Sequence, residues 1–186
     1  NKHLLIEANE HQKSYSRIRP LIESVIKYNF RKNNKLICIG GGITQDITAF
    51  ISSIIFRGVE WIFFPTTLLS QADSCIGGKT SINIGKYKNQ IGNFYPPSKI
   101  IILPKFLRTL SELDFKSGLG EMLHFYLVSS DGDFEFYSEN YQKSFTDDNI
   151  LLELIKRNLE IKKRFIEKDE FDLGERQLLN YGHSFG

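Results

Sequence analysis

The sequence predicts a parallel α/β unit that is followed by an α-helical part. Between residues 14 and 104, short apolar runs typical of buried strands alternate with segments whose apolar residues recur at helical spacing. A strand–helix–strand order over this distance is typical of parallel pairing. After about Leu110 only the helical spacing continues. We therefore assign residues 1–108 to an α/β domain and residues 109–186 to an α-helical domain.

The first elements follow from apolar spacing. Residues 14–28 predict a helix, because five apolar residues between Ile18 and Ile26 share one face and Pro20 lies near the first turn. Residues 36–39 predict a buried strand that ends at three consecutive glycines. Residues 47–58 predict a second helix, and Gly58 suits its C-terminus.

Two more buried strands and two helices complete the prediction. The strands are expected at residues 61–64 and 100–103, and each stops at a proline. Ser111 and Asp114 have the spacing of a capping box at the start of a helix. The longest helix is expected from Thr146 to about Glu167.

Composition excludes several classes of protein. With 41% hydrophobic and 25% charged residues, the 186-residue chain can build a core and is not expected to be disordered. A net charge of +2 argues against nucleic acid as a partner. The apolar runs are too short to span a membrane, and the first residues carry no signal-peptide pattern. Two cysteines, Cys38 and Cys75, fit a reduced, cytoplasmic chain.

The glycine turn at residues 40–42 lies between a predicted strand and a predicted helix. Residues without a Cβ let a phosphate approach the backbone N–H groups at a helix N-terminus, which would fit a nucleotide. A tight turn that needs glycine for its conformation alone fits the pattern equally well. The turn is not the G-x-G-x-x-G fingerprint of dinucleotide-binding proteins.

A second glycine-rich segment is rich in cations and amides. Residues 73–80 end like a phosphate-binding P-loop, but Asp73 stands where that motif needs glycine, so a P-loop NTPase is disfavoured. Lysines and asparagines then gather around Gly85 and Gly92. They are Lys79, Asn83, Lys86, Lys88 and Asn89. This composition favours recognition of a small anionic, hydroxylated ligand over a merely solvated loop.

Four residues of the helical part could also carry chemistry. Glu121 and His124 share a helix face, a spacing used for metal ligands, although an exposed acid beside a half-buried histidine gives the same pattern. His183 lies in a glycine-containing turn, with the same two interpretations. Lys162 falls on the apolar face of the longest helix, where a lysine is costly unless it is paired, used in function or extended to the helix edge.

Eight segments, in order along the chain, resemble the 3-dehydroquinate synthase family of sugar-phosphate cyclases. The most specific are residues 77–83 and 88–92. The other six are residues 10–14, 40–46, 56–58, 65–74, 120–121 and 176–183. The resemblance therefore covers nearly the whole chain.

The resemblance implies a Rossmann-like NAD-binding domain followed by an α-helical metal- and substrate-binding domain, both incomplete in this chain. The family converts a seven-carbon sugar-acid phosphate into 3-dehydroquinate with loss of phosphate. NAD is reduced and then reoxidised, and a divalent metal, zinc or cobalt, polarises the carbon–oxygen bond. A cytoplasmic homodimer is implied, with no nucleic acid or membrane as partner.

The resemblance also assigns site residues. Glu121 and His183 match two metal ligands, and the third is a histidine beyond Gly186. The positions matching the cofactor site are Glu10, Lys13, Gly41, Gly42, Asp46, Thr66, Thr67, Lys88, Phe106 and Thr109. The positions matching the substrate site are Asp73, Lys79, Asn89, Lys162, Arg176 and Asn180, with Arg57 at the substrate phosphate, reaching from the neighbouring copy of a dimer.

One departure from the family pattern concerns the substrate. His124 stands three residues after Glu121, where the common 3-dehydroquinate synthases have lysine. A permanent cation is thereby replaced by an imidazole, which titrates near neutral pH. Lys162 and Asn180 favour 3-dehydroquinate synthase, whereas His124 favours a sister cyclase that makes a valiolone-type or inosose-type ring. Remoter alternatives are a metal-dependent alcohol or glycerol-phosphate dehydrogenase and an NAD-binding pseudoenzyme.

Overall fold

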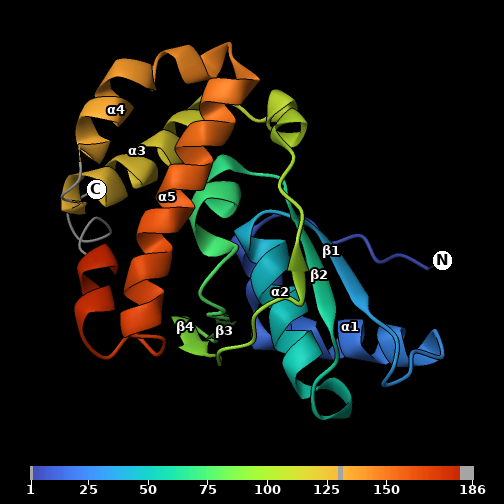
Figure 1. Ribbon diagram of the computed structural model, residues 1–186. Coiled ribbons are helices and arrows are strands. Elements are labelled where there is room, and N and C mark those ends of the chain that lie inside the picture. The colour runs from blue at the N-terminus through green and yellow to red at the C-terminus, as the bar shows by residue number, and fades with distance from the viewer. Residues whose placement is uncertain (1, 130–131, 181–186) are drawn as a thin grey trace. The chain divides into compact units, whose positions relative to one another are not determined.

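The computed structural model describes residues 2–129 and 132–180. These residues form two compact units, whose elements are drawn in Figure 1. The first unit comprises Asn1–Pro65 and Gly78–Ile102, and the second comprises Thr66–Gly77 and Leu103–Gly186. The chain therefore passes between the units three times, and the second of these passages falls between two adjacent glycines.

A parallel sheet of three strands forms the centre of the first unit. Its order is β1–β2–β5, with β1 at Leu36–Gly40, β2 at Trp61–Pro65 and β5 at Lys99–Ile100. Cys38 pairs with Phe63, and Phe63 pairs with Ile100. The predicted strands and their parallel pairing are confirmed, but the third strand is shorter than expected and begins one residue earlier, because only Lys99 and Ile100 join the ladder.

Two helices complete the core of the first unit. Helix α2 (Gly42–Ile54) packs against β1 and β2, and helix α1 (Tyr15–Lys27) packs against α2 (Figure 1). Both helices carry a stripe of apolar residues, as the spacing predicts. The buried cluster between them is Ile18, Val25, Ile47, Phe50, Ile51, Ile55, Val59 and Ile82.

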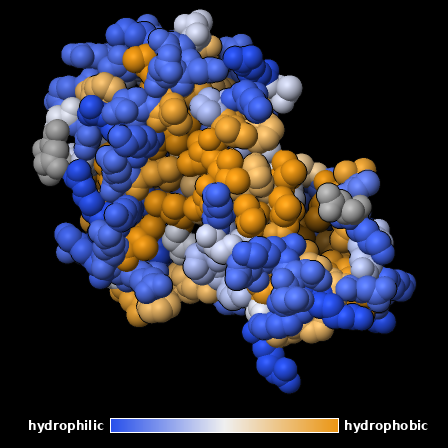
Figure 2. All heavy atoms as spheres, turned by 45° about the vertical axis from the view of Figure 1, so that its right-hand side comes forward, coloured by the Kyte–Doolittle hydropathy of each residue, from blue (hydrophilic) through white to orange (hydrophobic). Residues whose placement is uncertain are grey.

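The prediction that residues 36–39 form a fully buried strand is wrong. Side chains of a strand alternate between the two faces of a sheet. Cys38 is 1% exposed on the face toward α2, whereas Ile37 and Ile39 are 62% and 61% exposed on the other face. Figure 2 shows a face of the molecule on which hydrophobic side chains gather. Strand β1 thus buries one face and exposes apolar side chains on the other within the described residues.

A two-stranded antiparallel hairpin in the first unit was not predicted. Strand β3 spans Ile82–Ile84 and strand β4 spans Tyr87–Ile91. The loop between them contains Gly85, whose φ of +56° is the left-handed conformation that glycine adopts most readily. The cation-rich segment is therefore an ordered hairpin whose inner strand, β3, reaches the core through Ile82.

The second unit is helical, as predicted. It contains α3 (Glu112–Val128), α4 (Asp133–Asn140) and α5 (Asp148–Lys168), together with short 3-10 helices at Pro104–Thr109 and Glu175–Asn180. A π-helical turn at Ser70–Ser74 lies against α3 and α5. Met122, Tyr126 and Leu154 are fully buried in its core.

Side-chain caps set where the two long helices begin. The Ser111 hydroxyl accepts a hydrogen bond from the Asp114 N–H at 3.1 Å, so the predicted capping interaction of α3 is confirmed. Helix α5 begins at Asp148, two residues later than predicted, because the Asp147 carboxylate accepts the free N–H groups of Asn149 and Ile150. Within residues 2–129 and 132–180, no helix combines the length and apolarity needed to cross a membrane.

Candidate functional site

The glycine turn leads directly from β1 into α2. A Cβ on Gly40 would lie 2.7 Å from the side chain of Thr44, so glycine is required there for packing. A Cβ on Gly42 would meet nothing within 4 Å. Gly41 is the N-cap residue and provides no side chain to the helix terminus. The turn is therefore tight at its start and open at the helix N-terminus, where backbone N–H groups favour an anion.

A buried ion pair lies one turn into α2. The Lys13 ammonium, on the 3-10 helix Glu10–Lys13, donates to Asp46 Oδ2 at 2.7 Å. The two side chains are only 10% and 18% exposed. Burial raises the pKa of the Asp46 carboxyl, and the positive charge of Lys13 and the hydrogen bonds from Lys13 and Ser81 oppose that rise. The pair brings together two residues that the motifs assign to the cofactor site.

Ser81 extends this cluster toward the hairpin. Its backbone N–H donates to Asp46 Oδ1 at 3.2 Å. Its hydroxyl lies 3.0 Å from Asp46 Oδ2 and 3.0 Å from Asn89 Oδ1, and accepts from Lys13 Nζ at 3.1 Å. Sequence reasoning missed Ser81, since its only signal is its place inside the motif at residues 77–83.

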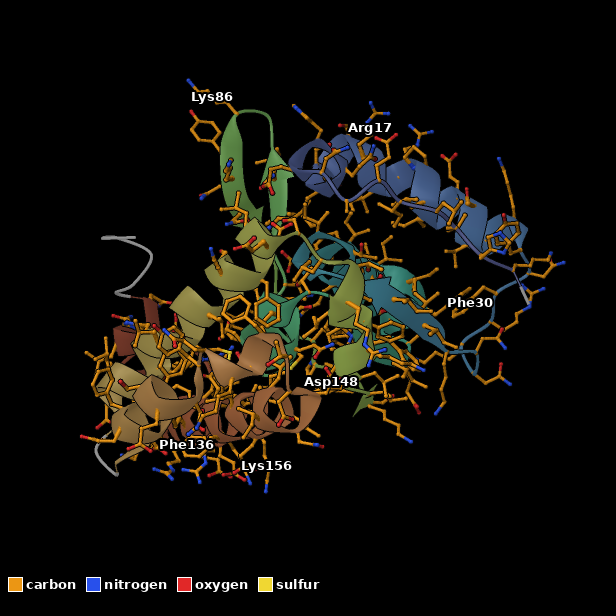
Figure 3. All side chains as sticks on the ribbon, turned by 90° about the horizontal axis from the view of Figure 1, so that it is seen from above. Arg17, Phe30, Lys86, Phe136, Asp148 and Lys156 are labelled. Carbon is orange, nitrogen blue, oxygen red and sulfur yellow. The ribbon has the colours of Figure 1, made fainter. Side chains whose placement is uncertain are left out.

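Asn83 and Glu10 fix the middle of strand β4. The Asn89 N–H donates to Asn83 Oδ1 at 2.8 Å, and Asn83 Nδ2 donates to Glu10 Oε1 at 2.7 Å. Asn89 has a φ of +56°, which asparagine tolerates better than most residues. Glu10 and Lys13 therefore hold the hairpin from one short helix. Lys86 instead lies at the hairpin tip and points away from it (Figure 3).

In the second unit, a buried lysine contacts the π-helical turn. Lys162 of α5 is 7% exposed, and its ammonium donates to the Asp73 carbonyl at 2.7 Å and to Asp73 Oδ1 at 2.8 Å. The expectation that Lys162 needs a partner is confirmed. One turn earlier, the buried Asn158 donates to the Ala72 carbonyl at 2.9 Å. Local π-helical geometry is frequent at functional sites.

Arg176 contacts the segment that follows the π-helical turn. It is 3% exposed, and its guanidinium donates to the carbonyls of Gly77 and Glu170. Burial lowers the pKa of Arg176, while nearby aspartates, first Asp172 and then Asp169, oppose the change. The segment from Ala72 to Gly77 is thus held by an amide, an ammonium and a guanidinium from the helical part.

Glu121 and His124 both lie on α3, as predicted. His124 Nε2 lies 3.1 Å from the Leu178 carbonyl, so this nitrogen carries the proton and donates. His183 lies outside the described residues. In the part of the chain that the structure describes, no three histidine, cysteine, aspartate or glutamate side chains gather as a metal site would require. The metal assignment therefore stays a prediction.

The remaining predicted residues are placed as follows. In the first unit, Arg57, Lys79 and Lys88 have exposed side chains. In the second unit, Thr67 Oγ1 donates to Ser70 Oγ at 2.8 Å beside the π-helical turn, and Asn180 Nδ2 donates to Asp172 Oδ2 at 3.1 Å. Also in the second unit are Thr66, Phe106 and Thr109. Their roles toward a ligand stay predictions.

The chain belongs to the 3-dehydroquinate synthase family. The family's N-terminal model, 3-dehydroquinate synthase N-terminal, matches residues 3–117, and its C-terminal model, 3-dehydroquinate synthase C-terminal, matches residues 118–186. The 3-dehydroquinate synthase of Dictyoglomus turgidum is 41% identical over 98% of this chain and 52% of its own length. That of Bartonella tribocorum is 38% identical over 98% of this chain and 48% of its own length. The chain thus spans about half the length of these relatives.

Solved structures share the fold. A 2-epi-5-epi-valiolone synthase from Streptomyces hygroscopicus, with NAD⁺ and Zn²⁺ bound, matches with a TM-score of 0.86 and 26% identity. The match covers 97% of this chain and 51% of that one. A 2-deoxy-scyllo-inosose synthase complexed with carbaglucose-6-phosphate, NAD⁺ and Co²⁺ matches with a TM-score of 0.91 at 24% identity, over 98% and 50% of the two chains. The fold is that of the NAD-binding sugar-phosphate cyclases.

Proposed function

We propose that this chain carries the dinucleotide- and substrate-binding residues of a 3-dehydroquinate synthase. The reaction is conversion of a seven-carbon sugar-acid phosphate into 3-dehydroquinate with release of phosphate. Curated relatives at about 40% identity bear this name, which supports the proposal. A cytoplasmic homodimer, as the family motifs imply, is part of the proposal.

The observation that carries the proposal is the buried Lys162–Asp73 pair. An ammonium has three donors, and Lys162 uses two of them on Asp73. The third N–H can serve an anionic oxygen of the substrate, and Asp73 fixes the direction in which it points. A buried lysine destabilises the folded state unless its charge is paired or serves function. Here the pair with Asp73 also orients the ammonium. The family motifs also assign Arg57 and Lys79, two exposed cations of the first unit, to substrate-binding positions.

The residues around α2 fit a dinucleotide. Gly42 leaves open space at the helix N-terminus, where a pyrophosphate is favoured, and Asp46 can accept hydrogen bonds from ribose hydroxyls. NAD, when bound, would take up and return a hydride. Glu121 and His183, at the positions that match family metal ligands, would hold a divalent metal that polarises the carbon–oxygen bond being oxidised.

Phosphate release tests the proposal. The full-length protein, given the sugar-acid phosphate and catalytic NAD⁺, should release inorganic phosphate without accumulating NADH. Removal of divalent metal with a chelator should stop the release, and added Zn²⁺ or Co²⁺ should restore it. Absence of phosphate release from the metal-loaded protein would overturn the proposal. Release that is unchanged by the chelator would overturn the metal assignment alone.

A sister cyclase is the second candidate, and His124 is the observation that favours it. The structures with TM-scores of 0.86 and 0.91 are synthases of valiolone-type and inosose-type rings. A sister cyclase would turn over a sugar phosphate that lacks the carboxylate, and would leave the sugar-acid phosphate unchanged. Steady accumulation of NADH would instead indicate a dehydrogenase.

A further inference from the structure

The Ser81 hydroxyl lies where the predicted cofactor and substrate residues of the first unit meet. It is 3.1 Å from Lys13 Nζ, 3.0 Å from Asp46 Oδ2 and 3.0 Å from Asn89 Oδ1. Lys13 and Asp46 match cofactor positions, whereas Asn89 matches a substrate position. One hydroxyl thus bridges residues assigned to both ligands.

A hydroxyl has one proton, so these contacts cannot all be satisfied by donation from Ser81. Lys13 donates to the hydroxyl oxygen, which leaves Asp46 and Asn89 as competing acceptors. If the proton goes to Asn89, the amide oxygen of Asn89 faces Ser81 and its NH₂ faces away. If the proton goes to Asp46, the Asn89 amide turns over, its NH₂ donates to Ser81 and its oxygen faces away.

The surroundings leave the amide group of Asn89 as the part that can turn. Its backbone is fixed at a φ of +56° by the bond from its N–H to Asn83, which Glu10 holds in turn. The Asp46 carboxylate stays in place through Lys13 and the backbone N–H of Ser81. The proton of Ser81 therefore selects the group that Asn89 presents outward.

We propose that Ser81 is a positioning residue that couples dinucleotide binding to substrate binding through the Asn89 amide. This inference rests on the proposed function and deepens it. A ribose hydroxyl that donates to Asp46 satisfies the carboxylate in place of Ser81. The Ser81 proton then goes to Asn89 Oδ1, the atom that faces it at 3.0 Å, and this bond holds the Asn89 NH₂ outward, where it can donate to an anionic or hydroxyl oxygen of the substrate.

The test measures how NAD⁺ changes affinity for a substrate analogue. The probe is the phosphonate analogue of the sugar-acid phosphate, from which phosphate cannot be eliminated. Its dissociation constant is measured by titration calorimetry on the metal-loaded full-length protein, with and without saturating NAD⁺. In the wild type we expect NAD⁺ to tighten binding at least about five-fold, the lower end of common coupling between sites.

Ser81→Ala should bring that factor close to one, and Ser81→Thr, which keeps the hydroxyl, should preserve it. Ser98→Ala is the matched control, because it removes a hydroxyl that donates to the Trp61 carbonyl away from this cluster. The side-chain amide resonances of Asn89 should shift on addition of NAD⁺ in the wild type and not in Ser81→Ala.

The outcomes separate the two proposals. If NAD⁺ does not tighten phosphonate binding in the wild type, or tightens it equally in Ser81→Ala, the role of Ser81 is overturned while the proposed function stays intact. Failure of the wild-type protein to bind either NAD⁺ or the phosphonate would overturn the proposed function, and with it this inference. Circular dichroism of each variant checks that the fold is retained.

Discussion

Lys13 and Lys162 are the two lysines buried among the described residues, and each contacts an aspartate at 2.7–2.8 Å. Taking two charges out of water costs several kcal/mol per ion, and their attraction offsets that cost only when the geometry is good. A hydrophobic pair of similar volume would serve stability at least as well. Two such pairs in residues that the family motifs single out are better explained by ligand binding than by stability.

The Lys162–Asp73 pair should behave as a coupled unit in unfolding experiments. Lys162→Met leaves the Asp73 carboxylate largely buried without its cation, and should lower the free energy of unfolding by about 3 kcal/mol. Adding Asp73→Asn should recover part of that loss. Lys116→Met, which breaks an exposed pair with Glu112, is the control and should change stability by less than about 0.5 kcal/mol. Urea titration measures all four proteins, and similar losses in the two single lysine variants would contradict the prediction.

His124 is tested by His124→Lys. The Nε2 proton of His124 is donated to the Leu178 carbonyl, an interaction that a lysine ammonium can also make. We expect the variant to keep its metal content and its fold. If His124 contacts substrate where the common 3-dehydroquinate synthases have lysine, the variant should keep activity with the sugar-acid phosphate.

Metal analysis of the dialysed variant, together with circular dichroism, decides between the two roles of His124. Loss of bound metal with the fold intact would show that His124 is a metal ligand.

At the scale of elements, the helices and the parallel strands were predictable because their signals are local. Apolar residues at helical spacing mark α1, α2 and α5, and short apolar runs ending at glycine or proline mark the strands. The β3–β4 hairpin was missed because four of the five residues of β4 are exposed and polar or aromatic, so the strand has no apolar alternation. The π-helical turn was missed because its geometry depends on contacts from α5, which lies far along the chain.

Part of the site was predictable for the same reason. Lys162 stands out locally, as a charged residue on an apolar helix face, and the motifs single out Asp46 and Asp73. The partnerships of these residues are long-range, however: Lys13 with Asp46, and Lys162 with Asp73. Ser81 and Asn158 carry no local signal and become visible only through their contacts.

Two glycine turns offer a matched test of backbone and packing requirements. Gly77 and Gly85 both have a positive φ, +93° and +56°, which costs another residue about 1 kcal/mol or more. A Cβ at Gly85 would meet nothing within 4 Å, whereas one at Gly77 would lie 2.2 Å from the Arg176 guanidinium. Gly85→Ala should therefore lower the free energy of unfolding only by the cost of holding alanine at a positive φ.

Gly77→Ala should destabilise by at least about 1 kcal/mol more than Gly85→Ala, because a buried guanidinium must also move. Urea unfolding of each variant measures the difference. Combining Gly77→Ala with Arg176→Ala should give less than the sum of the two losses, since both disturb one contact. Equal losses in the two glycine variants would show that the contact with Arg176 is readily relaxed.

At the scale of the whole molecule, segments of the two units alternate along the chain. Residues Thr66–Gly77 leave the first unit after β2, form the π-helical turn of the second and return at Gly78. Asp73 lies in this insertion, and Lys79 follows it by six residues in the first unit. Consecutive substrate positions of the motif therefore belong to different units, joined by two glycines with positive φ.

Arg57 provides the test of a functional dimer. It lies just beyond the C-terminus of α2, with a φ of +61°, and its side chain is exposed. The family resemblance implies that Arg57 serves the substrate phosphate of the neighbouring copy in a two-fold dimer, and we predict that it does so here.

Mixing two inactive variants tests this directly. Arg57→Ala and Lys79→Ala are refolded together, so that heterodimers form. One site in each heterodimer then has an intact Lys79 from one copy and an intact Arg57 from the other. With random pairing, half of the dimers are mixed and each has one complete site, so phosphate release should recover to about a quarter of the wild-type rate.

Mixing Lys79→Ala with Asn89→Ala is the control and should recover nothing, because both residues serve the site of their own copy. Native mass spectrometry confirms pairing, and heterodimers without activity would show that Arg57 does not act across the interface.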